Sequence, residues 1–308
     1  SPERQSFYCF GCQAKGDIFE FVQKFEGLEF KEALKILAER TGVELKQYKQ
    51  ENKDEESKKE RLLKVLEEAT QIYENLLGCG NQMSTNEEVM KYLEDRGLKE
   101  ETIKKWRIGW APLEWRTILN ELITKGFKEG ALLDAGLVKK TEDKTKTYDV
   151  FRGRIMFPIF DISGRVIAFS GRILIPQGAS LVTKEAPWGK APKYVNSPET
   201  ELFKKSETLY GLHLAKSEIR RLDYTVLVEG QIDLVLSHQA GVKNTVASSG
   251  TALTESHLKK IQKLSNRCIV ACDADTAGKA AARRSGELAL SLGMEVKIAS
   301  LPEGEDPA

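Results

Sequence analysis

Residues 267–278 read RCIVACDADTAG, and this stretch decides the fold of the C-terminal part of the chain. An apolar run leads directly into Asp-x-Asp, and small residues follow as far as Gly278. A short, continuous apolar run between turn residues is typical of a strand buried on both faces of a parallel sheet. We therefore predict a buried strand that brings two carboxylates, Asp273 and Asp275, to the edge of such a sheet.

The sequence around this strand alternates strictly between strand and helix patterns. Strand patterns cover 224–230, 244–249, 267–275 and 295–302, and helix patterns cover 231–241, 254–264 and 276–292. Strands that alternate with helices over short connections form a parallel sheet covered by helices. The fold class predicted for the whole chain is α/β and multidomain.

Carboxylates gather where these strands are expected to end, which is the edge where open parallel sheets bind ligands. They are Glu229 after the first strand, Asp233 in the turn that follows, Asp273 and Asp275 after the third strand, and Asp306 after the last. Such a cluster repels itself unless it holds protons or cations. Oxygen ligands without nearby His or Cys suit Mg²⁺ or Mn²⁺, which serve phosphoryl and nucleotidyl transfer. For Asp233 alone, a role as a helix cap is an equally good interpretation.

The middle of the chain is basic. Residues 151–221 hold 12 Lys and Arg against 6 Asp and Glu, whereas the net charge of all 308 residues is only +1. Nucleic-acid-binding proteins use such cations to replace counterions along phosphates, and aromatic or amide side chains to stack on bases and bond to them. Taken singly, each cation is better explained as surface charge. The candidate nucleic-acid and nucleotide ligands are Arg152, Arg154, Arg172, Lys193, Tyr194, Asn196 and Lys205.

The N-terminal region carries a C-x-x-C motif, Cys9 and Cys12, before a helix expected to bury Ile18, Phe19, Val22 and Phe25. Two cysteines supply half of the four ligands of a structural zinc site. A redox role is the alternative, but no thioredoxin-like pattern surrounds the motif. Five cysteines in the chain fit a reduced compartment and a metal better than a disulfide framework.

Two further segments complete the chain. Residues 46–61 are highly charged and predict a linker or a solvated helix. Residues 154–161 and 165–174 predict two strands joined by a turn, and a long Gly- and Pro-containing loop follows over 174–192. No apolar run approaches the ~20 residues that a membrane span needs, and no secretory signal is recognisable.

Ordered motifs along the chain resemble a known family. VEGQID at 228–233 and DADTAG at 273–278 are similar to the Toprim module of bacterial-type primases, topoisomerases and some nucleases. The remaining motifs narrow the resemblance to DnaG-type DNA primases with a CHC2-type zinc ribbon. They are FYCFGC-x-x-x-GDIF at 7–19, YL-x-x-RG at 92–97, IG-x-AP at 108–112, FRGRIMFPIFDISGRVIAFSGR at 151–172, PKYVNSPET at 192–200 and LYGL at 209–212.

The resemblance implies a template-directed polymerase that makes RNA primers during DNA replication. Glu229, Asp273 and Asp275 would form the catalytic centre, with Asp233 and Asp306 joining them at the metal. The family often has another Asp after GEDP, and Ala308 in that position predicts one carboxylate fewer or a different completion of the site. The basic segment would hold the single-stranded DNA template, the RNA primer and the incoming ribonucleoside triphosphate.

The resemblance also implies an organisation and a setting. We expect a fragment of a longer protein, in which zinc ligands precede Cys9 and a further domain binds the replicative helicase of the primosome. The cell compartment would be the bacterial cytoplasm, at the nucleoid. The expected units are the end of a zinc-binding domain (1–45), a charged linker (46–61), the helical first part of the polymerase core (62–147), a basic α+β subdomain for template and nucleotide (148–222) and a Toprim domain cut short at its C-terminus (223–308).

Three other functions stay open. A Toprim topoisomerase or nuclease would explain the acidic residues, but a topoisomerase needs a tyrosine nucleophile from a separate domain. A DNA-binding protein or recombination mediator would have no need of mutually repelling carboxylates. A phage-type primase–helicase would carry a P-loop, which does not occur within residues 1–308.

Overall fold

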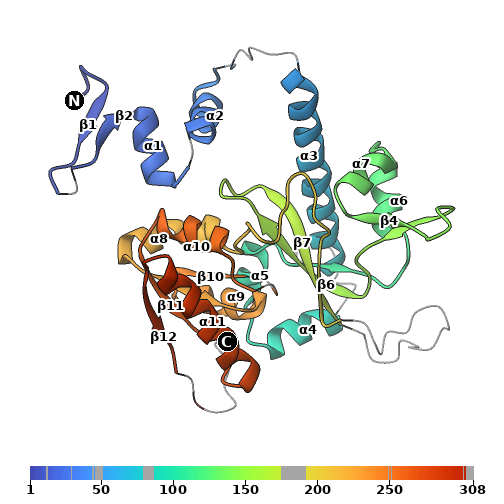
Figure 1. The fold of residues 1–308 in the computed structure, drawn as a ribbon. Coiled ribbons are helices and arrows are strands. Elements are labelled where there is room, and N and C mark those ends of the chain that lie inside the picture. Colours follow the sequence, from blue (N-terminus) through green and yellow to red (C-terminus); the bar gives the residue numbers. More distant parts are fainter. Residues whose placement is uncertain are drawn as a thin grey trace.

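The computed structural model describes residues 1–11, 13–28, 30–43, 45, 51–78, 87–174, 192–248, 250, 252–300 and 302. Figure 1 shows three parts: a small N-terminal unit, a central unit built on a long helix and an antiparallel sheet, and a C-terminal unit built on a parallel sheet. The predicted α/β multidomain class is confirmed. Among the described residues, no helix combines the length and the apolar character needed to cross a membrane.

The C-terminal unit has the alternation that the sequence predicts. Its four strands pair in the order β10-β9-β11-β12, and every pairing is parallel. Helices connect the strands and cover the sheet, because parallel neighbours need a crossover that returns the chain to the same edge. The elements are α8 (Leu212–Leu222), β9 (Thr225–Val228), α9 (Gln231–Gln239), β10 (Thr245–Ala247), α10 (Glu255–Gln262), β11 (Arg267–Val270), α11 (Thr276–Ser291) and β12 (Glu295–Ile298).

The central unit is built on a four-stranded sheet in the order β3-β6-β7-β8, all antiparallel. β6 and β7 are the predicted pair of strands, and all seven residues of β6 are buried. Its elements are α4 (Glu87–Asp95), α5 (Glu100–Lys105), β3 (Gly109–Ala111), α6 (Thr117–Thr124), α7 (Glu129–Asp134), β4 (Val138–Lys140), β5 (Thr147–Asp149), β6 (Arg154–Phe160), β7 (Val166–Ile173) and β8 (Tyr194–Asn196). Most of the predicted 174–192 loop lies outside the described residues.

The long helix α3 (Glu51–Leu77) crosses the back of this sheet (Figure 1). It is continuous through the boundary expected between residues 61 and 62, so much of the charged segment is helical. The helix and β3 approach so closely that a Cβ on Gly109 would lie 2.5 Å from the carbonyl carbon of Tyr73. Only glycine fits at this crossing without displacing the helix backbone.

The N-terminal unit consists of the hairpin β1 (Ser6–Tyr8) and β2 (Lys15–Asp17) with α1 (Ile18–Glu26) and α2 (Phe30–Thr41). Its core is small: Val22, Leu28 and Ala33 form one buried cluster, and Ala38 of α2 is also buried. The expectation that α1 also buries Ile18 and Phe25 was wrong, since these side chains are 51% and 55% exposed. Two short helices and one hairpin offer too little apolar surface to cover every apolar side chain of α1.

One shared core joins the central and C-terminal units. Trp106, Ile155 and Phe157 of the central unit pack in the same cluster as Val228 of β9 and Ile232 of α9. Burial of this shared apolar surface fixes the two units relative to one another.

Arg107 ties the end of α5 to α3. Its guanidinium donates to both oxygens of Glu67 at 2.8 Å and to Glu74 at 2.8 Å. Arg107 also occupies the left-handed region with a φ of 55°. A planar guanidinium can serve two carboxylates at once, whereas an ammonium group cannot reproduce the fork.

We predict that Arg107→Lys lowers the free energy of unfolding by about 1–2 kcal/mol, because two charged hydrogen-bond partners lose their fork. The matched control is Arg283→Lys, which alters an exposed pair with Glu287 within one helix and is expected to change stability by less than about 0.5 kcal/mol. Urea denaturation of both variants measures the difference. Equal losses in the two variants would contradict this role for Arg107.

Candidate active site

Two of the predicted carboxylates meet at the C-terminal edge of the parallel sheet. β9 and β11 are direct neighbours, and Val270 pairs with Leu227 at their last shared step. Glu229 therefore leaves β9 at nearly the level where the chain leaves β11 toward Asp273. The thiol of Cys272 donates a hydrogen bond to Glu229, and the charges of both carboxylates act on it.

Burial raises the pKa of the Cys272 thiol to about 12, and the charges of Glu229 and Asp273 act in the same direction. The thiol is thus protonated at neutral pH in the absence of a metal ion, and in this state it acts as a hydrogen-bond donor. Oε1 of Glu229 is buried, and no described residue forms a hydrogen bond with it. A buried carboxylate oxygen without a partner is costly, which is the condition that a cation or a proton relieves.

Asp233 and Asp275 both cap helices in this structure. Asp275 is the N-cap of α11, and its Oδ1 accepts from the Gly278 backbone N–H at 2.6 Å. Oδ2 of Asp233, in the first turn of α9, accepts from the Gly230 backbone N–H at 3.0 Å. β11 ends at Val270, so Asp275 does not continue the strand as the sequence suggested. Both side chains therefore act as helix caps, which is the interpretation that the sequence offered for Asp233.

The predicted metal ligands are only partly assembled within the described residues. In this part of the chain, no group of three or more His, Cys, Asp and Glu side chains could hold a metal ion. Asp306 lies outside the described residues, as does Cys12. Cys9 is exposed on the turn after β1, where its backbone N–H donates to the Ala14 carbonyl.

The edge of the antiparallel sheet lies next to the acidic edge. The buried side chain of Gln231 at the start of α9 donates from Nε2 to Oγ of Ser170 in β7 at 2.8 Å. Ser170 pairs with Asn196, and Arg172 pairs with Tyr194 two residues further along the same strands. Burial raises the pKa of Tyr194 to about 12, and the nearby charge of Asp233 adds to this rise. Tyr194 therefore lies at the junction of the basic and acidic sides of the site.

Arg172, Tyr92 and Arg96 form a row of cations and an aromatic ring that extends from this junction. The Arg172 guanidinium lies 4.6 Å from the ring centre of Tyr92 and 6.0 Å from that of Tyr194. Nε of Arg96 donates to the Tyr92 hydroxyl at 3.1 Å. Sequence reasoning used Tyr92 and Arg96 only as part of a family motif. It missed Tyr92, Gln231 and Cys272 as site residues, although Gln231 stands inside VEGQID and Cys272 directly before DADTAG.

The other predicted cations occupy different surroundings. Arg154 is buried, and its Nη1 donates to the carbonyl of Gly171 at 2.9 Å and to that of Pro192 at 3.2 Å. Burial lowers the pKa of Arg154 to about 10. Arg154 thus joins β6 to β7 and to the residue before Lys193, and its role toward a ligand stays a prediction. Lys193 is exposed, and the half-buried Lys205 offers its backbone carbonyl to Nε2 of His257.

Arg152 lies apart from the row formed by Arg172, Tyr92 and Arg96. Its guanidinium lies 4.2 Å from the ring centre of Trp115 and 5.2 Å from that of Tyr148. The positive charges of Arg152 and Arg154 are still close enough to influence one another. Sequence reasoning did not identify Trp115, because its partner is 37 positions away in the chain.

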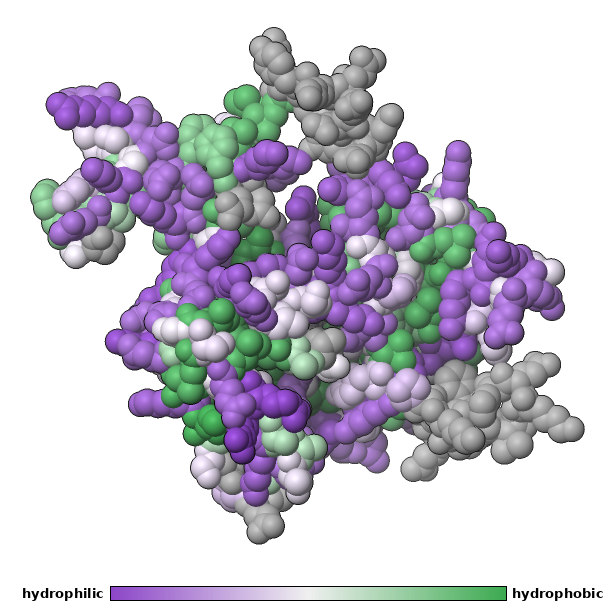
Figure 2. Space-filling view, viewed as in Figure 1, coloured by the Kyte–Doolittle hydropathy of each residue, from purple (hydrophilic) through white to green (hydrophobic). Residues whose placement is uncertain are grey.

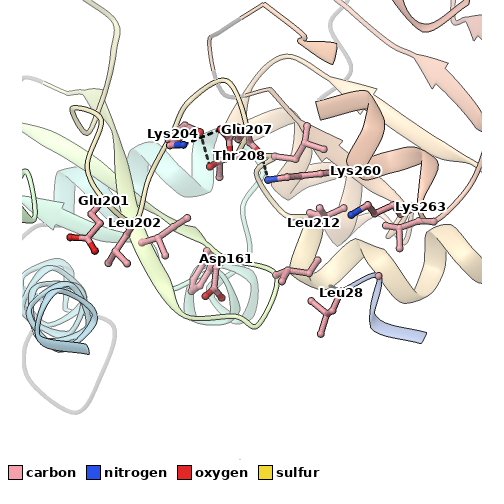
Figure 3. A pocket seen from close by; sticks show the side chains of 16 residues that line it. Leu28, Asp161, Glu201, Leu202, Lys204, Glu207, Thr208, Leu212, Lys260 and Lys263 are labelled. Atoms are coloured by element: carbon pink, nitrogen blue, oxygen red, sulfur yellow. Dashed lines mark hydrogen bonds and ion pairs between the residues drawn. The ribbon is translucent and has the colours of Figure 1, made fainter. Parts of the chain in front are cut away.

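A cavity of about 440 Å³ opens elsewhere, between the N-terminal unit, the turn after β6 and α10 (Figure 3). Leu28, Asp161 and Lys263 line it from these three sides. In Figure 3, Lys204 and Lys260 both bond to Glu207, the former to its carboxylate and the latter to its backbone carbonyl. None of the predicted site residues lines this cavity.

Comparison with known proteins gives three matches to family models along the chain. Residues 1–53 match the CHC2 zinc finger, residues 79–216 match the N-terminal domain of the DNA primase catalytic core, and residues 226–308 match a Toprim-like family. The boundaries between these families fall near the boundaries between the three structural units.

Curated relatives and solved structures agree with these matches. The DNA primase of Clostridium acetobutylicum is 36% identical over 100% of this chain and 48% of its own length, and that of Pseudomonas aeruginosa is 37% identical over 100% and 45%. The chain spans about half the length of the curated relatives it matches. The zinc-binding and RNA polymerase domains of Aquifex aeolicus primase align with a TM-score of 0.71 at 34% identity, over 100% of this chain and 70% of that one. A DnaG catalytic domain bound to single-stranded DNA aligns with a TM-score of 0.68 at 35% identity, over 82% and 74%.

Gly278 sets the position of the acidic turn. A Cβ at this residue would lie 2.2 Å from the carbonyl oxygen of Asp273, closer than any real contact. Gly278→Ala must therefore displace the turn that carries Asp273, and we predict a loss of about 1–3 kcal/mol in unfolding free energy.

The matched control is Gly286→Ala in the same helix, where the new Cβ would lie 3.5 Å from Ile298. A glycine in a helix interior costs roughly 0.5–1 kcal/mol relative to alanine, so this variant is expected to be neutral or slightly more stable. Urea denaturation distinguishes the two. The close contact at Gly278 would be contradicted by two variants of equal stability.

Proposed function

The chain belongs to the DnaG family of DNA primases, and from this premise we propose that its full-length protein synthesises short RNA primers on single-stranded DNA. The reaction is nucleotidyl transfer. The primer 3′-hydroxyl attacks the α-phosphate of an incoming ribonucleoside triphosphate, a new P–O bond forms, and pyrophosphate leaves. The observation that best supports this proposal is the meeting of Glu229 and Asp273 beside the Arg172–Tyr194 edge.

The acidic edge fits a divalent cation with hard oxygen ligands. Glu229 has a buried oxygen without a partner among the described residues, and Asp273 follows the adjacent strand. Mg²⁺ commonly uses only one or two carboxylates and takes water and phosphate oxygens for its other positions. We propose that Glu229 and Asp273 hold Mg²⁺ or Mn²⁺, with Asp306 near them and with Asp233 and Asp275 fixing the helices. A bound cation would neutralise charge on the transferred phosphate and lower the pKa of the attacking hydroxyl.

The protein's own residues have distinct tasks in this proposal. The Cys272 thiol orients the Glu229 carboxylate through its hydrogen bond. Arg172 and Lys193 face phosphates, while Tyr194 and Asn196 hold a base or sugar of the template or nucleotide at the junction. Lys205, for which the structure describes only a backbone contact, remains a candidate for the same surface.

The N-terminal unit would bind zinc. Cys9 and Cys12 would supply two thiolates, the ligand type that structural zinc prefers, and Cys9 already lies exposed on a tight turn. The partners in this proposal are the single-stranded DNA template, ribonucleoside triphosphates and the RNA primer. A replicative helicase is a further proposed partner. The site of action in this proposal is the bacterial cytoplasm, at the nucleoid.

The test is primer synthesis by the full-length protein on single-stranded DNA with ribonucleotides and Mg²⁺ or Mn²⁺. Glu229→Gln and Asp273→Asn are expected to lower the rate at least about 100-fold, since a catalytic cation is worth several kcal/mol and 1.36 kcal/mol is tenfold. Chelation with EDTA should abolish the products. Glu255→Gln, an exposed carboxylate paired with Lys259, is the matched control and should leave the rate unchanged.

The alternatives give different results in the same assay. Metal-dependent nicking or relaxation of plasmid DNA without primer synthesis would leave a Toprim topoisomerase or nuclease as the better assignment. Strand binding without either reaction would favour a DNA-binding protein. Full primer synthesis by both carboxylate variants would contradict the role of the acidic edge.

A further inference from the structure

A second cationic and aromatic surface lies away from the acidic edge. The β4–β5 hairpin projects from the far side of the central unit, opposite the C-terminal unit (Figure 1). In Figure 2, which has the same viewpoint, this edge of the molecule is largely hydrophilic. Four exposed lysines lie on the hairpin: Lys139, Lys140, Lys144 and Lys146.

These lysines are not neutralised by ion pairs. None of the ion pairs formed among the described residues involves any of the four. The hairpin also carries Glu142 and Asp143, but Asp143 is engaged in the turn. It accepts from the Thr145 backbone N–H at 3.0 Å, from the Thr145 hydroxyl at 2.8 Å and from the Thr141 hydroxyl. The turn is therefore organised internally, and Lys144 and Lys146 on it are exposed.

Trp115 is the unusual residue of this surface. Its side chain is 44% exposed, whereas Trp106 and Trp110 are 1% and 2% exposed. An exposed, well-held indole on a soluble protein is uncommon and often marks a binding surface.

Its backbone and ring are both held in place. The Trp115 carbonyl accepts from the Asp149 backbone N–H at 2.9 Å, which joins it to the end of β5. Its ring meets that of Tyr148 edge to face at 5.3 Å, and the Arg152 guanidinium lies over it. Lys139 lies 5.2 Å from the ring centre of Tyr148. The indole is thus a rigid platform within a group of cations.

Each feature alone has an ordinary explanation, since a charged hairpin is usually a solvated surface. Together they combine cations with a preorganised aromatic ring, which is how proteins bind single-stranded nucleic acid without sequence preference. We propose that Trp115 and the β4–β5 hairpin form a second binding surface for single-stranded nucleic acid, in which a base stacks on Trp115 and the hairpin lysines contact phosphates. This proposal rests on the proposed function in one respect, the identity of the bound strand, which would be the DNA template or the RNA product.

The test measures strand binding without nucleotides or metal ions, so that it does not depend on catalysis. Fluorescence anisotropy of labelled single-stranded DNA and RNA would be recorded with the full-length protein and its variants. Trp115→Ala is expected to weaken binding about 5-fold or more, because stacking of one base contributes ~1–3 kcal/mol. Trp115→Phe keeps an aromatic face and the ring beside Tyr148, and it should retain most of the affinity.

A second set of variants tests whether the hairpin lysines contact phosphates. Lys144→Gln combined with Lys146→Gln should reduce the slope of log K against log salt by about 1.4, since each of the two contacts with a single strand contributes ~0.7. The matched control is Lys259→Gln combined with Lys279→Gln, two exposed lysines of the C-terminal unit, and it should leave the slope unchanged. A larger effect on DNA would assign the surface to the template, and a larger effect on RNA would assign it to the product.

The proposal would be overturned if Trp115→Ala and the hairpin variant bound both strands like the unaltered protein. It would also fall if Trp115→Phe lost as much affinity as Trp115→Ala, because the ring would then act only through packing. If the protein makes no primers while Trp115→Ala still weakens binding, the second surface stands and the polymerase assignment falls.

Discussion

The parallel pairing of β9 with β11 is the constraint on which the site depends. Both strands end at the same edge, so the residues that leave them must share a small volume. Glu229 and Asp273 come together there although they are 44 positions apart in the chain, and the buried thiol of Cys272 bonds to Glu229 and lies near the charges of both. The geometry brings like charges together at a cost in free energy. In the proposed function, a divalent cation offsets that cost.

The site also requires that the edge of the antiparallel sheet be held in a fixed position beside the acidic edge. The Gln231–Ser170 hydrogen bond and the shared core around Trp106 join the antiparallel sheet to the parallel one. Arg172 and Tyr194 are thereby held next to the acidic side chains rather than on an independently moving domain. This arrangement suits a reaction in which the triphosphate of a nucleotide contacts both these side chains and a cation held by the carboxylates. The surface around Trp115 lies farther out, where a strand would be held rather than transformed.

Much of this fold follows from local patterns in the sequence. The alternation over 224–302 predicts the parallel sheet, and the sheet in turn predicts that Glu229 and Asp273 meet. The roles of Asp233 and Asp275 do not follow, because a carboxylate at a strand–helix junction can cap the helix or bind an ion. Nor does charge predict the position of Arg154, whose guanidinium is buried between β6 and β7. The stacking of Arg152 on Trp115 depends on tertiary packing that no periodic pattern reveals.

The proposed active site depends most on whether Glu229 and Asp273 hold a divalent cation. The most direct measurement is anomalous X-ray diffraction from crystals of the full-length protein soaked in Mn²⁺. We expect an anomalous peak within coordination distance of a carboxylate oxygen of Glu229 and of Asp273, with Cys272 close by but not coordinating. Mn²⁺ bound only elsewhere, with the Glu229 carboxylate still held by the Cys272 thiol alone, would contradict the account.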